Sequence, residues 1–206
     1  MKGGSIIAHV SKNGTMNPVN ILFFVLASFM GMEEARIVSR KVSVTFNPAT
    51  KTIEIAQEDL FSIIVMPEDS VAVVNELQRI LVIAQHGEKA GENGFTIEKV
   101  LLHSSNLLLN ADIQVSYTDP ESLEKAGIGF DAATGFSMIN IPEWNIRSST
   151  AVLEGNYWTW PPDKPVTFVM EAFEHLPEGY AEYRRSILPF WDRLQTTGYS
   201  SPKKEN

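Results

Sequence analysis

The segment with the strictest alternation of apolar and polar residues spans residues 107–117, LLLNADIQVSY, and it constrains the fold more than any other part of the chain. One side of the alternation consists of Leu107, Leu109, Ala111, Ile113, Val115 and Tyr117, and the other side is polar apart from Leu108. A period of two predicts a β-strand with one buried face and one solvated face. Strands of this kind are typical of antiparallel sheets, so we expect an antiparallel sheet here.

A first β-hairpin is predicted from residue 38 onwards, where apolar and polar residues again alternate. The sequence Asn-Pro-Ala-Thr-Lys at residues 47–51 has the composition of a turn. If Pro48 to Lys51 form the loop, Phe46 lies opposite Ile53, and the two apolar faces match. The same register places Val44 opposite Ile55.

A second β-hairpin is predicted around residues 131–135, with Gly135 available for a positive φ angle. This loop pairs Phe130 with Phe136 and Ile128 with Met138, so the apolar faces match again. Hairpin loops of this length cannot join parallel strands, which argues against a doubly wound α/β fold. Further strands are expected at residues 60–66, 96–103, 150–153 and 166–170.

Three helices are expected. Apolar residues recur at spacings of three and four over residues 71–85, which predicts a helix there, with a strand at 79–84 as the alternative. Asp119, Pro120 and Glu121 form a helix start, and Gly127 ends that helix after barely two turns. A C-terminal helical stripe, interrupted at Pro189, consists of Tyr180, Tyr183, Ile187, Trp191 and Leu194.

Together these elements predict an α+β fold, rich in antiparallel β-sheet and curled toward a barrel. We expect one globular domain over residues 36–199, preceded by an extension at residues 1–35 and followed by a polar tail at 200–206. The sequence contains no internal repeat and no interior linker.

The extension contains an uncharged apolar run at residues 21–30, which is too short to cross a bilayer and matches the core of a signal peptide. Lysines precede the run and Glu33 and Glu34 follow it, as export requires. Ala35 is small enough to precede a cleavage site, although Glu33 is unfavourable two places earlier. This pattern favours a periplasmic or secreted protein. The alternatives are a helix in the core of a cytoplasmic protein, a retained anchor, and translation from Met16.

Composition excludes several classes of function. A net charge of −8 and a pI near 5.0 argue against a nucleic-acid partner, which requires a basic surface. The chain has no cysteine, so it has no disulfide, thiolate nucleophile or thiolate metal ligand. We expect no cofactor, no metal and no transmembrane span.

No catalytic motif stands out. The four histidines form no metal-ligand pair, and no phosphate-binding loop or nucleophile elbow occurs. His103 and Asp112 are scattered acid–base candidates, and each also fits an ordinary position on a polar strand face.

One aromatic segment could carry recognition. Tyr157, Trp158 and Trp160 are flanked by Gly155 and a Pro-Pro pair, and in a strand the two indoles share one face. We include Trp144 with them as a candidate ligand-binding residue. The alternative is that both tryptophans of the segment fill the core.

These observations favour an exported, non-enzymatic binding or interaction protein whose partner is a small molecule, a glycan or another protein. Two alternatives remain. The first is a small cofactor-free hydrolase that uses His103 and Asp112, and the second is an envelope-anchored assembly component.

Overall fold

A computed structural model describes residues 36–86, 88–89, 94–176 and 178–197. The elements, in chain order, are β1 (Val38–Asn47), β2 (Thr52–Ile63), α3 (Pro67–His86), β3 (Glu88–Lys89), β4 (Phe95–Ser105), β5 (Leu108–Tyr117), α4 (Pro120–Lys125), β6 (Ile128–Asp131), β7 (Gly135–Ile139), η1 (Pro142–Trp144), β8 (Val152–Glu154), β9 (Tyr157–Trp160), β10 (Val166–Met170), η2 (Ala181–Tyr183), β11 (Arg184–Ser186) and α5 (Leu188–Thr196). The extension predicted at 1–35 and the tail at 200–206 lie outside the described residues.

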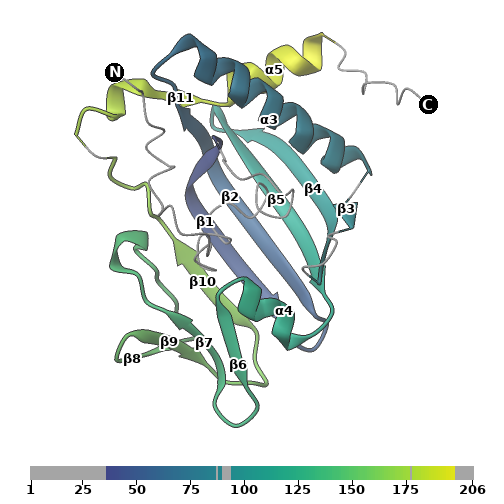
Figure 1. Cartoon of the computed structure of the whole chain (residues 1–206), viewed down its shortest axis with the longest axis vertical. Helices are drawn as coiled ribbons and strands as arrows, with labels where there is room; N and C mark the ends of the chain where they lie inside the picture. The colour runs from purple at the N-terminus through teal and green to yellow at the C-terminus, as the bar shows by residue number, and fades with distance from the viewer. Residues whose placement is uncertain (1–35, 87, 90–93, 177, 198–206) are drawn as a thin grey trace.

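The strands form two antiparallel sheets, which confirms the predicted β-rich α+β class. The larger sheet has seven strands in the order β10-β1-β2-β5-β4-β3, with β11 also paired to β2, and the smaller sheet has the order β6-β7-β9-β8. In Figure 1, α3 lies across one end of the larger sheet, and α4 and the smaller sheet lie at its other end. Neither sheet closes into a barrel within the described residues, so the predicted curling does not reach closure.

Both predicted hairpin registers are confirmed. Strand β1 pairs with β2 so that Phe46 faces Ile53 and Val44 faces Ile55. Strands β6 and β7 pair Phe130 with Phe136, as predicted, and they also pair Asp131 with Gly135, so the connecting loop is shorter than expected. The alternation of apolar side chains and the turn residues were sufficient to define these local registers.

The strand predicted from 107–117 is β5, which lies between β2 and β4 in the sheet. From Leu109 onwards every second residue is buried, as expected. The prediction was wrong for Leu107, which lies in the turn before β5 and is 86% exposed. Asn106 and Leu107 both have positive φ angles, 52° and 62°, which form the tight reversal between β4 and β5.

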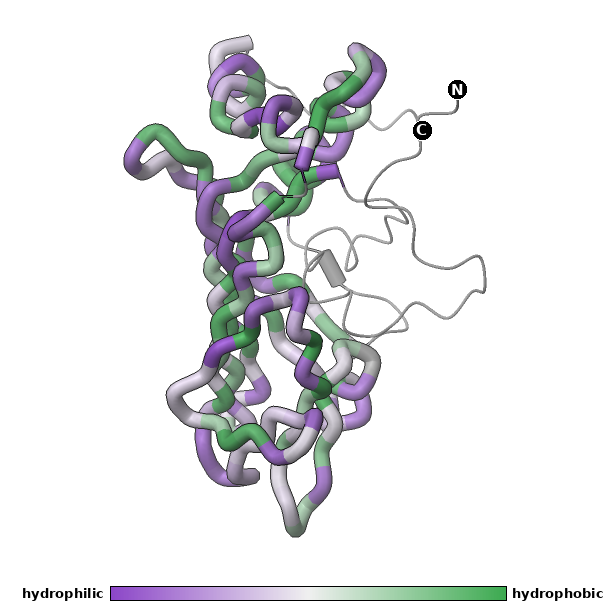
Figure 2. Tube along the Cα trace, turned by 90° about the vertical axis from the view of Figure 1, so that its left-hand side faces the viewer, coloured by the Kyte–Doolittle hydropathy of each residue, from purple (hydrophilic) through white to green (hydrophobic). Residues whose placement is uncertain are grey.

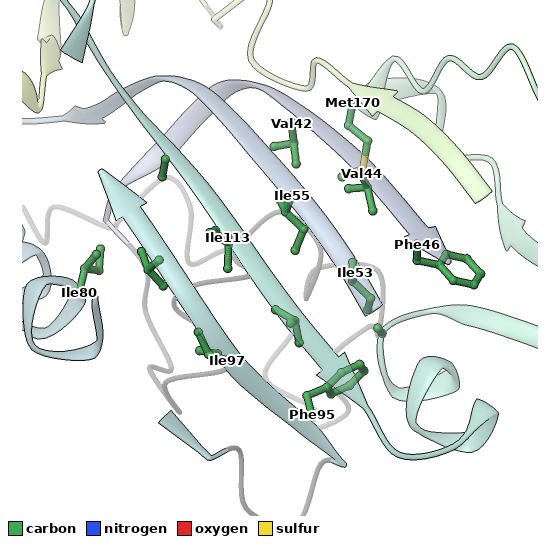
Figure 3. Close-up of a cluster of buried hydrophobic side chains, with 14 of the residues drawn as sticks. Val42, Val44, Phe46, Ile53, Ile55, Ile80, Phe95, Ile97, Ile113 and Met170 are labelled. Atoms are coloured by element: carbon green, nitrogen blue, oxygen red, sulfur yellow. The ribbon is translucent and has the colours of Figure 1, made fainter. Parts of the chain in front are cut away.

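One face of the larger sheet carries the hydrophobic core. In Figure 3, side chains of β1, β2, β4 and β5 project from this face, and Ile80 of α3 extends toward them. The predicted helix at 71–85 is confirmed as α3, which buries Val73, Leu77 and Ile80. Figure 2 shows hydrophobic and hydrophilic residues alternating along the strands. The opposite face of the sheet is therefore polar.

The short helix predicted after Asp119 is confirmed as α4. The Asp119 side chain accepts a hydrogen bond of 2.8 Å from the backbone N–H of Ser122, and Pro120 occupies the first helical position. Gly127 follows the helix with a φ angle of 78°, which only glycine adopts without strain. Leu123 of this helix is fully buried, so α4 closes its end of the core.

The prediction of a C-terminal helix is only partly correct, because the helix is α5 alone. Tyr180, Tyr183 and Ile187 precede it, and residues 184–186 form strand β11, which pairs with β2. Strand β5 accompanies β2 only as far as Gln57, which pairs with Ala111. The end of β2 would otherwise have unpaired backbone groups, and β11 satisfies them.

Gly135 positions the smaller sheet. Its φ angle is 95°, and a Cβ atom there would lie 2.1 Å from the carbonyl oxygen of Trp160. Strands β7 and β9 therefore approach each other at residue 135 more closely than any residue with a Cβ atom would allow. Phe136 follows directly, and its ring meets that of Phe46 edge-on at 4.7 Å, which joins the smaller sheet to the core of the larger one.

Among the described residues, no helix has both the length and the apolar character needed to cross a membrane.

Candidate functional site

The polar face of the larger sheet contains two neighbouring rows of side chains that cross four strands. Strand pairing places one row at Thr45, Glu54, Gln114 and Lys99, and the other at Ser43, Ala56, Asp112 and Leu101. These positions alternate with buried core residues of the same strands, so their side chains point away from the core.

A β-bulge in β4 places Lys99 and Leu101 on this face. The pairing of β4 with β5 shifts between Ile97 and Lys99, which leaves Glu98 as the extra residue. After the shift Val100 points into the core, where it is 5% exposed, and its two neighbours point outward. The bulge therefore changes which residues of β4 face solvent.

An open hollow of about 360 Å³ lies over these two rows, and it is lined by Ser43, Thr45, Glu54, Ile55, Ala56, Lys99, Leu101, Asp112, Ile113 and Gln114. Two carboxylates and one ammonium group line it, which leaves an excess of one negative charge. Within the described ranges, the side chains of Glu54, Lys99 and Gln114 form no hydrogen bond or ion pair. No described residue therefore occupies their donors and acceptors, which a ligand could bind.

The row on each side of the hollow contains one pair of interacting side chains. On one side the Lys41 ammonium lies 2.6 Å from the Glu58 carboxylate. On the other side Ser116 donates a hydrogen bond of 2.6 Å to Glu98. Among the described residues, Glu54, Lys99 and Gln114 are thus unpaired inside the hollow, whereas each neighbouring row contains a paired set of polar side chains.

The structure brings the two acid–base candidates together. His103 Nδ1 and Asp112 Oδ2 are 3.5 Å apart, and both side chains are partly exposed, by 40% and 55%. Asp112 lines the hollow, whereas His103 lies one row beyond it. The sequence contained both residues but no signal that they meet, because their contact depends on the pairing of β4 with β5.

Sequence reasoning missed Glu54, Lys99 and the two hydroxyl-bearing residues, Ser43 and Thr45. Each occupies the polar side of an alternating strand, where side chains usually face only water. The one local signal was the spacing of three between the apolar residues Ile97 and Val100, which breaks a period of two and indicates a bulge.

The predicted aromatic site is placed on strand β9 of the smaller sheet. Trp160 is buried at 1% exposure, with its indole N–H 3.3 Å from the Ser148 hydroxyl. Trp158 is half-buried and donates to the Asn140 side chain, and Tyr157 is 51% exposed. On this hairpin, Tyr157 and part of Trp158 are therefore accessible, and ligand binding by them stays a prediction.

The fourth predicted residue, Trp144, is half-buried in η1. Its carbonyl group accepts a hydrogen bond of 3.1 Å from the backbone N–H of Glu171, directly after β10. Trp144 therefore does not belong to the β9 strand that carries the other three aromatic residues. The strand pairing provides no shared row for the four.

A chain of charged groups lies where β2 changes its partner. The Asp59 side chain is 8% exposed, and its carboxylate is 2.7 Å from the Arg184 guanidinium and 3.5 Å from that of Arg40. Arg40 also faces Glu171, which pairs with Arg147. This network joins β1, β2, β11 and the segment after β10, and it is a structural feature rather than an open site.

No group of three or more His, Asp or Glu side chains in the described part of the chain is placed to hold a metal ion. Comparison with known protein families, with curated proteins and with solved structures found no match.

Proposed function

We propose that this chain is an exported, non-enzymatic binding protein that holds a small polar ligand in the hollow over β1, β2, β4 and β5. The observation that supports this proposal is the convergence of Glu54, Lys99 and Gln114, which have no partner among the described residues, with Asp112 in one cavity of about 360 Å³. A cavity with a few convergent polar groups is the usual form of a small-ligand site.

The lining defines the class of ligand. Glu54 and Asp112 accept hydrogen bonds, Lys99 donates them, and Gln114 does both. Leu101 is 46% exposed at the same place and offers an apolar contact. These groups suit a ligand with several hydroxyl or amino groups and some exposed C–H surface, such as a short amino-sugar chain. The excess negative charge favours an amine over a carboxylate or phosphate.

Binding of a glucosamine trisaccharide is the direct test. We expect Asp112→Asn and Glu54→Gln each to weaken its Kd by about tenfold or more, because a hydrogen bond to a charged group contributes about 1.5 to 3 kcal/mol. Isothermal titration calorimetry measures the affinity. Glu154→Gln on β8 is the matched control, since it removes an exposed carboxylate from another sheet.

Two further readouts complete that test. Backbone amide NMR shifts on titration should map to β1, β2, β4 and β5. The N-acetylated trisaccharide, which has no charged amine, separates amine recognition from hydroxyl recognition. Equal affinity in the wild type and both variants would contradict the assignment of the ligand site to this hollow.

A second candidate function rests on the contact between His103 and Asp112. His103 Nδ1 lies 3.5 Å from the Asp112 carboxylate without a hydrogen bond to a described residue, and a small rotation of either side chain would let the carboxylate orient the imidazole as a general base. If the protein is a hydrolase of this kind, His103→Gln should lower its rate of p-nitrophenyl acetate hydrolysis by about a hundredfold. His175→Gln, at an exposed loop histidine, is the control. The same rate in both variants would remove this candidate.

Export is supported by the apolar run at residues 21–30 and the acidic residues that follow it. We expect the full chain, expressed in a Gram-negative host, to be recovered from the periplasm without its first residues. Intact-mass measurement identifies the first residue that remains. Recovery of the whole chain from the cytosol alone would contradict the export proposal.

A further inference from the structure

The first two described residues, Arg36 and Ile37, are bound by a buried carboxylate of helix α3. The backbone N–H of Arg36 donates to Glu76 Oε2 at 2.6 Å, and the backbone N–H of Ile37 donates to the same oxygen at 3.2 Å. Glu76 is 5% exposed, so this carboxylate lies inside the protein and faces the start of β1.

The Arg36 side chain is held by the same helix. Its guanidinium lies 2.8 Å from the carboxylate of Asp69, and the other oxygen of Asp69 accepts backbone hydrogen bonds from Val65 and Met66, directly before α3. Residue 36 is therefore bound at two points, through its backbone nitrogen and through its side chain.

Two neutral amides are weak partners for a buried carboxylate. Burial raises the pKa of the Glu76 carboxyl to about 7, although the two backbone N–H groups and the guanidinium groups of Arg36 and Arg79 act in the opposite direction. These groups thus do not offset the cost of burying the ionised carboxylate. A positively charged group at the position of the Arg36 nitrogen would stabilise the ionised form.

We propose that Glu76 is a binding site for a new chain terminus, formed when the protein is cleaved between Ala35 and Arg36. This inference rests on the export proposal, because a peptidase of the export route would supply the cleavage. One water molecule hydrolyses the peptide bond, Ala35 leaves with the new carboxylate, and Arg36 retains a protonated amino group. That ammonium lies where the amide nitrogen lies now, within 2.6 Å of Glu76 Oε2.

The proposal connects the candidate cleavage position after Ala35, where Glu33 is unfavourable two places earlier, with the residue that α3 holds. Ala35 is the small residue that precedes the predicted cut, and Arg36 is the residue whose backbone nitrogen faces Glu76. A single ammonium group has three N–H donors and a charge, whereas an amide has one donor and no charge. Processing would convert a poorly compensated carboxylate into a buried ion pair.

The test compares the same full chain before and after a defined cut. Gly31→Asp, Met32→Asp, Glu33→Asp, Glu34→Asp and Ala35→Lys together create an enterokinase site that leaves Arg36 as the first residue. Cell-free synthesis keeps the preceding residues attached until the protease is added. We expect the cut to raise Tm at pH 7.5 by about 3 °C or more, equivalent to roughly a tenfold change in the unfolding constant.

The pH dependence distinguishes an ion pair from a general effect of removing residues 1–35. In the uncut chain the pKa of Glu76 is higher in the folded state than in the unfolded state. Its contribution to stability is therefore fully present below about pH 4.5 and is lost as the pH rises through about 7. After the cut the ammonium should lower that pKa. The decrease in stability between pH 5.5 and 7.5 should then shrink or disappear.

Glu76→Gln and Glu68→Gln in the same background provide the matched pair of variants. The glutamine side chain of Glu76→Gln can still accept the two backbone hydrogen bonds but cannot form an ion pair, so the cut should no longer raise Tm. Glu68 is an exposed acid at the start of α3, and its replacement should leave the rise intact. The proposed ion pair is overturned if the cut does not raise Tm in the parent chain, or if it raises Tm equally in Glu76→Gln.

The natural cleavage site is tested separately by the mass of the exported protein. A first residue at Arg36 supports the proposal. Exported protein that begins at any other residue overturns it, even if the engineered cut is stabilising. Retention of the whole chain in the cytosol instead contradicts export, and the enterokinase comparison then reports only on the pairing of Glu76 with an ammonium group.

Discussion

Replacing Trp160 with alanine should lower the free energy of unfolding by about 3 to 5 kcal/mol, because it empties one of the largest fully buried side-chain volumes. The indole lies 5.9 Å from the Phe168 ring of β10, so it connects the smaller sheet to the larger one. Chemical denaturation monitored by far-UV circular dichroism measures the loss, since removing a tryptophan also changes the fluorescence signal.

Tyr157→Ala is the control for that substitution, because Tyr157 belongs to the same strand and is 51% exposed. We expect it to change the unfolding free energy by about 0.5 kcal/mol or less. Trp160→Phe should lower the free energy of unfolding less than Trp160→Ala does, since it keeps an aromatic ring in the site. Comparable small losses in Trp160→Ala and Tyr157→Ala would show that Trp160 is not a core residue, and would revive the prediction that it belongs to a recognition surface.

Replacing Asp59 with alanine should cost about 1.5 to 3 kcal/mol, because it removes the buried carboxylate that pairs with the partly exposed guanidinium groups of Arg184 and Arg40. The φ angle of Asp59 is 62°, a conformation in which alanine is less favourable than aspartate or asparagine. Asp59→Asn separates these two causes, since it tolerates the backbone and removes only the charge. Urea denaturation at pH 7 measures both variants.

Glu58→Ala is the matched control for Asp59, at the preceding position of β2. Glu58 forms an ion pair with Lys41 that is as short as that between Asp59 and Arg184, but its side chain is 44% exposed. Its loss should cost less than about 1 kcal/mol, because solvent screens an exposed pair. If the two alanine variants lose similar stability, the burial of Asp59 is not what makes its ion pairs important.

Sequence patterns predicted only part of the candidate ligand site. The alternation of β5 placed Asp112 and Gln114 on one polar face, and the hairpin register placed Val44 opposite Ile55. Neither pattern could place β5 beside β2, because that pairing joins segments more than fifty residues apart in the chain. The hollow exists only where β1, β2, β5 and β4 lie side by side, so its lining was not predictable from any one segment.

In the C-terminal segment, a local sequence pattern predicted a structure that a contact with a distant strand prevented. Tyr180, Tyr183 and Ile187 have helical spacing together with Trp191, and that spacing predicted a helical stripe interrupted at Pro189. The competing interaction was remote, since the end of β2 at Phe61 and Ile63 required backbone partners that β5 no longer supplied. Pro189 is compatible with a helix that begins only at Leu188, because proline fits the first turn of α5 but not the interior of a longer helix.

The sequence by itself determined the local features whose free energy depends on near neighbours: the two hairpin registers, the capped start of α4, the amphipathic helix α3 and the buried side of β5. Tertiary structure decided the order of the strands, the burial of Trp160, the meeting of His103 with Asp112 and the position of Glu76 beside the Arg36 nitrogen. The physical reason is that alternation and capping act over a few residues. Strand neighbours and buried charges depend instead on contacts between segments that only the complete fold brings together.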